Sequence, residues 1–450
     1  MKRLQALFTL PVISIFGLAL IVRVTYNYTV GNGYFPLHDS LTYQTIAYNI
    51  IREHCFCYLP HLPTVDRAPL WPTIIAAIYS VIGGQDRVVR IFLSFVGSGT
   101  CTLIYFFSKD LFGRRIGIIA GLAAALYPFL FIYDGWLYSE SLYIFLLFAF
   151  CYTLYHLQRS PHLDLMIISG LLLGLLSLTR PNGLLLLGLF IVWAVIIGWA
   201  KLIPWRKAIQ VAMIVSVISL ILVVPWTIRN FMVSHAFIPV AVGDGKVLLG
   251  AYNDDVANPS FQTGYYFGGW LRPEESLPSE AQRFPSQTCA ATCEVARDST
   301  FKADALQWIS QHISSMPMLI GLHAANMWAI TSDEADFPFN RYHDRRTSHL
   351  LVLMMEVTTP IVFALAAFGL IVTLIRWREL LFVYFMIALT FAQCIILYGI
   401  PRFRAPIEPM LILLAAGGVW WLMTQFSSYR KVREQEEKKH EDKLASISGN

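Results

Sequence analysis

Three carboxylates stand beside long apolar segments, where they could act on a lipid substrate at the depth of a membrane. Asp39 follows the first apolar segment, and Asp134 and Glu140 occupy a turn between two later ones. A carboxylate of this kind suits removal of a proton from a hydroxyl, or the binding of a divalent cation. We therefore treat all three as candidate catalytic residues. The alternative is that they cap the helices that follow them, since acids favour helix N-termini.

Five arginines lie in turns or at the ends of the same apolar segments: Arg67, Arg180, Arg229, Arg402 and Arg404. An arginine at the bilayer centre costs about 2.5–3.5 kcal/mol on insertion scales, and less near the interface. Guanidinium groups bind phosphate through paired, charge-assisted hydrogen bonds. The five arginines therefore predict a site for a lipid phosphate, unless each one simply extends to the outer head groups. His38 and Tyr43, close to Asp39, are further candidates for donor binding.

A divalent cation is the one cofactor that these residues suggest, with Asp39 and Glu140 as its potential ligands. Oxygen ligands of this type suit magnesium or calcium. No metal site is assigned from the spacing alone.

The composition indicates a chain that must be embedded in a membrane. Of 450 residues, 56% belong to the AVILMFWYC set and 14% are charged, and the mean hydropathy is +0.55. An average soluble domain has about 25% charged residues. The net charge of +5 is small and scattered, which argues against nucleic-acid binding. We predict an all-α polytopic membrane protein.

Ten apolar stretches approach the length of about 20 residues that a membrane-spanning helix needs. They are Leu7–Tyr26, Val88–Phe107, Ile116–Tyr133, Ser139–Tyr155, Leu163–Leu178, Gly183–Trp199, Ala208–Ile228, Leu350–Ile375, Leu380–Tyr398 and Ala405–Gln425. Two shorter pieces, Ala68–Ile82 and Met318–Ile330, are expected to lie in the interface. With both termini cytoplasmic, most Lys and Arg clusters fall on the inner side, as the positive-inside rule requires.

This topology divides the chain into four regions. Residues 1–228 form an N-terminal transmembrane module whose first outer loop, 27–87, carries Asp39. Residues 229–349 form a large outer loop region, and residues 350–426 form the C-terminal transmembrane helices. Residues 427–450 are charged, without apolar periodicity, and are expected to be a disordered cytoplasmic tail.

Several segments, taken in order, carry a resemblance to a known family. They are Asp39 with Tyr43 and Ala47, Arg67-Ala68-Pro69-Leu70-Trp71-Pro72, Leu111-Phe112-Gly113-Arg114-Arg115, Tyr138-Ser139-Glu140-Ser141-Leu142, Thr179-Arg180-Pro181-Asn182-Gly183, Pro225-Trp226-Thr227-Ile228-Arg229-Asn230 and Arg402-Phe403-Arg404-Ala405-Pro406. The chain resembles GT-C glycosyltransferases that use lipid-phosphate sugars, above all the protein O-mannosyltransferase and aminoarabinose-transferase branch. The ordered set is specific, although no single motif is.

The resemblance implies a catalytic aspartate in the first outer loop and an active site on the periplasmic or extracellular side of the plasma (inner) membrane. We expect an inverting transfer of a sugar from a polyprenyl-phosphate carrier to a hydroxyl of a glycan, lipid or protein acceptor. Asp39 would be the general base, and the arginines would stabilise the departing phosphate. Two departures stand out: Ser40 follows Asp39 where many relatives have Glu, and Arg67-Ala68-Pro69 replaces Lys-Pro-Pro.

Two other functions remain open. A flippase or transporter of a lipid-linked glycan would use the same arginines without a base, although two related halves, which would favour it, are not evident. A ligase or polymerase would take a glycan from a lipid diphosphate. The outer loops also hold Cys55, Cys57, Cys289 and Cys293, which admit three pairings, including a bridge between the two loops.

Overall fold

The structure is a computed structural model that describes residues 9–258, 270–273, 277, 290–330 and 345–448. It is predominantly helical, and the sheet within these residues consists of two short antiparallel strands. The predicted all-α architecture is therefore confirmed for the described part of the chain.

Each of the ten apolar stretches coincides with a helix. These helices are α2 (Leu10–Tyr28), α5 (Asp86–Phe112), α6 (Arg114–Leu126), α7 (Glu140–Leu157), α8 (Leu163–Thr179), α9 (Gly183–Trp199), α10 (Trp205–Ser234), α17 (Arg345–Thr373), α18 (Trp377–Ile396) and α20 (Glu408–Ser448). Six segments are long and apolar enough to cross a membrane, with α17 and α18 joined into one of them. The chain is an integral membrane protein, whereas the count of ten spans is not confirmed.

The third expected span is shorter than predicted. Helix α6 ends at Leu126 because Tyr127, which precedes Pro128, adopts an extended conformation, as residues before proline prefer. The chain then continues in two 3-10 turns, η1 (Pro128–Leu130) and η2 (Ile132–Gly135). The turn that carries Asp134 is therefore folded into the bundle.

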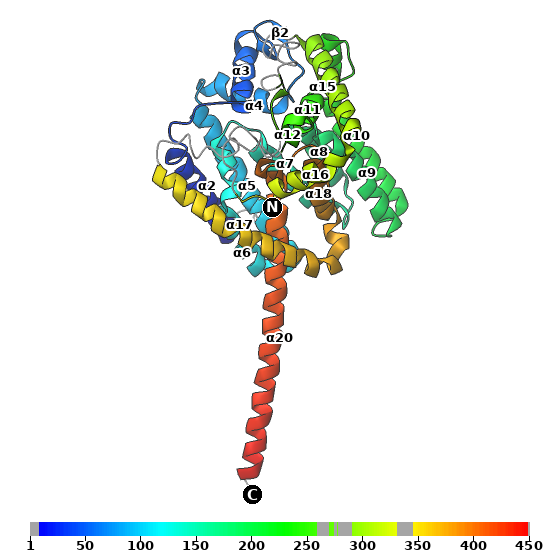
Figure 1. Cartoon of the computed structure of the whole chain (residues 1–450). Helices are drawn as coiled ribbons and strands as arrows, with labels where there is room; N and C mark the ends of the chain where they lie inside the picture. The colour runs from blue at the N-terminus through cyan, green and yellow to red at the C-terminus, as the bar shows by residue number, and fades with distance from the viewer. Residues whose placement is uncertain (1–8, 259–269, 274–276, 278–289, 331–344, 449–450) are drawn as a thin grey trace.

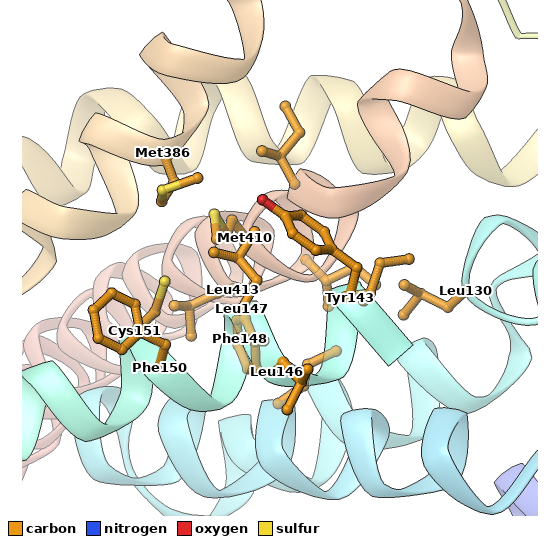
Figure 2. Close-up of a cluster of buried hydrophobic side chains, with 14 of the residues drawn as sticks. Leu130, Tyr143, Leu146, Leu147, Phe148, Phe150, Cys151, Met386, Met410 and Leu413 are labelled. Carbon is orange, nitrogen blue, oxygen red and sulfur yellow. The ribbon is translucent and has the colours of Figure 1, made fainter. Parts of the chain in front are cut away.

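Helix α7 is the centre of the bundle, and 72% of its apolar window is buried. Figure 2 shows its side chains packed against Met386 of α18 and against Met410 and Leu413 of α20. Phe148 and Phe150 have no exposed surface. Because α7 begins at Glu140, this packing holds that carboxylate at a fixed place at one end of the bundle.

The two loops that the sequence predicts on the outer side, which keep the names first and second outer loop, fold into small helical layers at that same end. The first contains α3 (Asp39–Arg52), the strands β1 (Cys57–Leu59) and β2 (Leu62–Pro63), and α4 (Leu70–Ile82). The second contains α11 (Asp244–Ala251), α12 (Asp254–Ala257), α15 (Ala291–Gln311), η4 (Ile313–Ser315) and α16 (Met316–Met327). Figure 1 shows α3 and α15 at one end of the molecule, with the C-terminus at the other. Cys55 pairs with Cys57 inside the first loop, so these two cysteines do not bridge the loops.

The end of α10 ties both outer loops together. Arg229 donates hydrogen bonds to the carbonyl oxygens of Thr64 (2.6 Å) and Phe56 (3.0 Å) in the first loop. Trp226 and Asn230 both donate to the carbonyl of Val240 at 2.8 Å, just before α11. The motif around Arg229 therefore anchors the loops, and the predicted role of Arg229 in binding a lipid phosphate has no support from its position.

The C-terminal tail is drawn as a helix as far as Ser448, where the sequence predicts disorder. Helix α20 continues through the charged segment to Ser448, and Figure 1 shows it projecting from the bundle. The tail is rich in Glu, Lys, Arg and Gln, which are strong helix formers. The lack of apolar periodicity shows that the segment has no packed face, but it does not prevent a helix.

Candidate active site

Asp39 lies at the start of α3 and meets two arginines from distant parts of the chain. Arg67 donates to its Oδ1 at 3.2 Å, and Arg402 donates to its Oδ2 at 2.8 Å. The Asp39 side chain keeps 32% of its surface exposed. His38, directly before it, has a φ of 51°, a region that costs non-glycine residues about 1–3 kcal/mol. The backbone is therefore strained at the point where Asp39 is presented.

Glu140 lies behind this pair and has no exposed surface. Its Oε1 accepts from Arg180 at 3.1 Å and also from the Nε of Arg402. One guanidinium, that of Arg402, thus joins the two carboxylates. It also lies 4.0 Å from the ring centroid of Tyr138, which supports its flat face.

Proline-rich turns set the positions of these arginines. Helix α8 ends at Thr179 because Arg180 precedes Pro181 and is extended, with φ −146° and ψ 138°. Arg402 lies in the single turn α19 (Pro401–Arg404) between α18 and α20. Trp71, at the start of α4, donates to the carbonyl of Leu137 at 2.9 Å, which holds the turn before α7.

The arginines change the acidity of Asp39. Burial raises its pKa, but the positive charges of Arg402 and Arg67 outweigh burial and hold the pKa well below its usual value. Burial, followed by the nearby charge of Asp39, raises the pKa of Tyr43. Asp39 is therefore an ionised hydrogen-bond acceptor with little affinity for a proton while both arginines remain in place.

A cavity of about 720 Å³ opens over these residues, and His38, Asp39, Tyr43, Arg67, Arg180 and Arg402 all line it. Its other part is apolar and extends between α7, α9 and α18, where the lining includes Leu147, Leu186, Met386, Leu389 and Leu397. Figure 2 shows Leu147 on α7 and Met386 on the neighbouring helix. A polar end and an apolar end in one cavity suit a ligand that is itself amphipathic.

Seven of the ten predicted site residues come together here, namely the six that line the cavity and Glu140 behind them. Three do not: Arg229, Asp134 and Arg404. Asp134 is fully buried in η2 and pairs with Arg23 of α2 at 2.7 Å. The predicted catalytic role of Asp134 therefore lacks geometric support. Arg23 itself stands in the first apolar stretch, and an intramembrane arginine was the available signal for a buried acidic partner.

Arg404 points away from Asp39, although it is only two residues from Arg402. It is fully buried, pairs with Glu408 at 2.6 Å, and donates to the carbonyls of Met327 (2.5 Å) and Ala329 (2.9 Å). These contacts join the end of α16 to the start of α20. Arg404 consequently fixes the turn that carries Arg402, in place of the predicted contact with a lipid phosphate.

Sequence reasoning missed three cations in the cavity wall: Lys246, Arg272 and Arg297. All come from the second outer loop, which shows no recognisable motif. Arg272 contacts Nδ1 of His38 at 2.5 Å. Because a guanidinium only donates, Nδ1 of His38 accepts in this contact.

Within the part of the chain that the structure describes, no three His, Cys, Asp or Glu side chains are grouped as a metal site would require. Asp39 and Glu140 are close to each other, but the guanidinium of Arg402 contacts both. A hard divalent cation takes six or more oxygen ligands. Two carboxylates with an arginine between them are a poor fit for such an ion.

Comparison with known proteins adds family evidence to this geometry. Residues 66–228 match the model of the family described as dolichyl-phosphate-mannose-protein mannosyltransferase. The resemblance to GT-C glycosyltransferases is confirmed. The matched range contains Arg67, Glu140 and Arg180 of the site, whereas Asp39 and Arg402 lie outside it. No curated protein sequence matches the chain.

Two solved structures with the same fold come from the archaeon Archaeoglobus fulgidus. The oligosaccharyltransferase AglB from Archaeoglobus fulgidus, in complex with an inhibitory peptide and a dolichol-phosphate, matches with a TM-score of 0.52 and 14% identity. The match covers 94% of this chain and 51% of that one. The same organism's oligosaccharyltransferase, tethered with an acceptor peptide, gives a TM-score of 0.52 at 13% identity. This match covers 93% of this chain and 50% of that one. This chain thus spans about half the length of these GT-C proteins.

ArnT from Cupriavidus metallidurans bound to undecaprenyl phosphate also matches, over 91% of this chain and 77% of that one, at 14% identity. Its TM-score of 0.42 is too low to establish a shared fold.

Proposed function

We propose that this GT-C-like chain is an inverting glycosyltransferase that moves a sugar from a polyprenyl-phosphate carrier to an acceptor hydroxyl. The reaction would take place at the outer face of the plasma (inner) membrane. The observation that carries the proposal is an ionised carboxylate, Asp39, held by Arg67 and Arg402 at the polar end of a cavity whose other end is apolar. The family match over residues 66–228 supports it.

The two ends of the cavity match the two parts of such a donor. The polyprenyl chain would lie along the apolar lining between α7, α9 and α18. The phosphate would bind Arg67, Arg180 and Arg402. Arg180 and Arg402 have only 14% and 12% of their side chains exposed, so their charges act in a medium of low dielectric constant.

The transfer would be a single displacement. The acceptor oxygen attacks the anomeric carbon of the sugar, and the bond from that carbon to the phosphate oxygen breaks. The phosphate leaves with the electron pair, its new charge stabilised by the arginines, while the acceptor proton passes to Asp39. Attack opposite the leaving group inverts the anomeric configuration.

Donor binding would also activate the base. Arg67 and Arg402 keep the pKa of Asp39 low by contacting both its oxygens. A phosphate competes for the same guanidinium groups, and each contact that Asp39 loses raises its affinity for a proton. Glu140 would keep Arg180 and Arg402 oriented during this exchange. Asp39 would therefore become an effective base only when a donor is present.

The mechanism needs no divalent cation. The suggestion that Asp39 and Glu140 hold one conflicts with the position of Arg402, which contacts both carboxylates. We propose that the guanidinium supplies the positive charge that a metal would otherwise bring to the leaving phosphate.

The decisive experiment compares wild type with Asp39→Asn in membranes supplied with labelled polyprenyl-phosphate sugars and endogenous acceptor. We expect the transfer rate to fall by about 10²–10⁴, the usual contribution of a general base. Binding of the polyprenyl phosphate should persist, because the neutral amide of this variant competes only weakly with a phosphate for the arginines. Asp164→Asn is the matched control, since Asp164 is exposed on α8 at the other end of that helix from Arg180.

Three outcomes would contradict the proposal. An unchanged transfer rate in Asp39→Asn would remove Asp39 from the mechanism. Lipid translocation that survives this substitution, without any sugar transfer by wild type, would favour a flippase. Transfer only from a lipid diphosphate would favour a ligase or polymerase.

A further inference from the structure

The second outer loop brings its own group of cations to the cavity, formed by Lys246, Arg272 and Arg297. Lys246 lies in the first turn of α11, Arg297 lies in α15, and Arg272 lies in the short described segment 270–273 between them. Each is partly buried. None of them belongs to the elements that supply Arg67, Arg180 and Arg402.

Hydrogen bonds hold two of these cations in a fixed relation. Asp298 of α15 accepts from the backbone N–H groups of Gly245 (2.9 Å) and Lys246 (3.3 Å) at the start of α11. Arg297 directly precedes Asp298 in the chain. The start of α11 and this turn of α15 are therefore locked together, with Lys246 and Arg297 both facing the cavity.

The third cation connects this group to the reaction centre. Arg272 contacts Nδ1 of His38 at 2.5 Å, and His38 immediately precedes Asp39. Arg272 and Asp39 also line the same cavity, so a ligand bound by Arg272 would share that cavity with the carboxylate that we propose as the base. That is the position an acceptor must occupy, since its hydroxyl has to meet Asp39.

The charge of the cavity favours an anionic ligand there. Among the described residues that line it, six are Lys or Arg and four are Asp or Glu. Two of these acids have partners in the first outer loop: Asp66 pairs with Arg67 at 2.7 Å, and Glu294 accepts from Thr64 and the N–H of Val65, each at 2.7 Å. Glu294 also faces the charge of Arg297. A cleft with excess positive charge and low-dielectric walls concentrates anions.

We infer that Lys246, Arg272 and Arg297 form a second anion subsite, distinct from the donor-phosphate site, which binds a phosphate group. With an acceptor phosphate the inference rests on the proposed function, whereas a second donor phosphate would replace the monophosphate donor of that function by a diphosphate. The phosphate belongs either to the acceptor whose hydroxyl reacts or to the second phosphate of a lipid diphosphate. Both sources share the same chemistry, because guanidinium and ammonium groups bind phosphate through charge-assisted hydrogen bonds.

The test measures binding, so it is independent of the transfer assay with Asp39→Asn. Purified full-length protein is saturated with a polyprenyl phosphate and then titrated with inorganic phosphate by calorimetry. We expect phosphate to bind beside the lipid. The double variant Arg272→Gln/Arg297→Gln should weaken phosphate binding by at least about tenfold, while the affinity for polyprenyl phosphate changes less than about twofold.

A matched control removes two exposed cations far from the cavity. Arg206→Gln/Lys207→Gln, at the start of α10, should leave phosphate binding as in wild type, which separates a local site from general charge. The inference is wrong if phosphate fails to bind the lipid-loaded protein, displaces the lipid, or binds the Arg272/Arg297 variant as well as wild type.

A second titration identifies the source of the phosphate. If the subsite holds the second phosphate of a donor, a polyprenyl diphosphate will bind wild type more tightly than the monophosphate and will block inorganic phosphate. The double variant will lose that advantage. If the subsite serves the acceptor, the monophosphate and diphosphate will bind with similar affinity, and inorganic phosphate will still bind beside the lipid.

Discussion

Removing the charge of Asp134 should lower the stability of the folded protein without lowering the transfer rate of the molecules that remain folded. Asp134 and Arg23 pair at 2.7 Å, and neither side chain has any exposed surface. Replacing one partner leaves the other as an uncompensated buried charge, which costs about 3–5 kcal/mol. We therefore expect Asp134→Asn and Arg23→Met each to lower the free energy of unfolding by about that amount.

The double variant provides the internal check. Replacing both groups, as in Arg23→Met/Asp134→Leu, removes the charges together, and such a change is often neutral or stabilising. The double variant should therefore be much closer to wild type than either single variant. Gly97→Ala should resemble the single variants, because its Cβ would lie against Oδ2 of Asp134 and Nε of Arg23.

The assay is thermal unfolding of the purified protein in detergent, together with the transfer rate per folded molecule. Wild type, the two single variants and the double variant form a complete cycle. The reasoning is refuted if Asp134→Asn unfolds at the wild-type temperature yet loses transfer. Asp134 would then act in the reaction, as the sequence first suggested.

Four further predictions follow from the site. Arg404→Gln leaves the buried Glu408 without its 2.6 Å partner and should destabilise the protein by about 3–5 kcal/mol in thermal unfolding; an unchanged melting temperature would contradict this. Because the pKa of Asp39 is lowered on folding, its stabilising effect is complete above the usual value of 3.8 and is lost as the pH falls further. The difference in unfolding free energy between wild type and Asp39→Asn should hence be constant near neutral pH and shrink below about pH 4; a difference that grows in acid would reverse the sign of our argument. Leu389→Trp, in the apolar lining, should raise KM for a long-chain donor by about tenfold but hardly affect a short-chain one. Chelation by EDTA should leave the transfer rate unchanged, and loss of activity that magnesium restores would show that a cation takes part.

Some features of this protein could be read from the sequence because they depend on local composition. Apolar stretches of this length must be buried in a bilayer, whatever their position in the chain. The helices therefore form in the segments of high hydropathy. The proline turns around Arg180 and Arg402 were also visible, since proline restricts the residue before it. These features predicted that Asp39, Arg67, Arg180 and Arg402 stand at one end of the bundle.

The composition of the charged tail pointed to a different structure from the one observed. The charged tail after residue 427 has no apolar face, which suggested disorder. Its residues nevertheless favour helix individually, and α20 continues through them to Ser448.

Only the tertiary structure decided which charges share a pocket. Arg402 and Arg404 are two residues apart, yet one reaches Asp39 and the other is buried against Glu408. Lys246 and Arg297 are far apart in sequence and meet through Asp298. The physical reason is that a buried charge needs a partner of opposite charge or a hydrogen-bonding group. Which partner is nearest depends on how the helices pack, and a local sequence pattern does not contain that information.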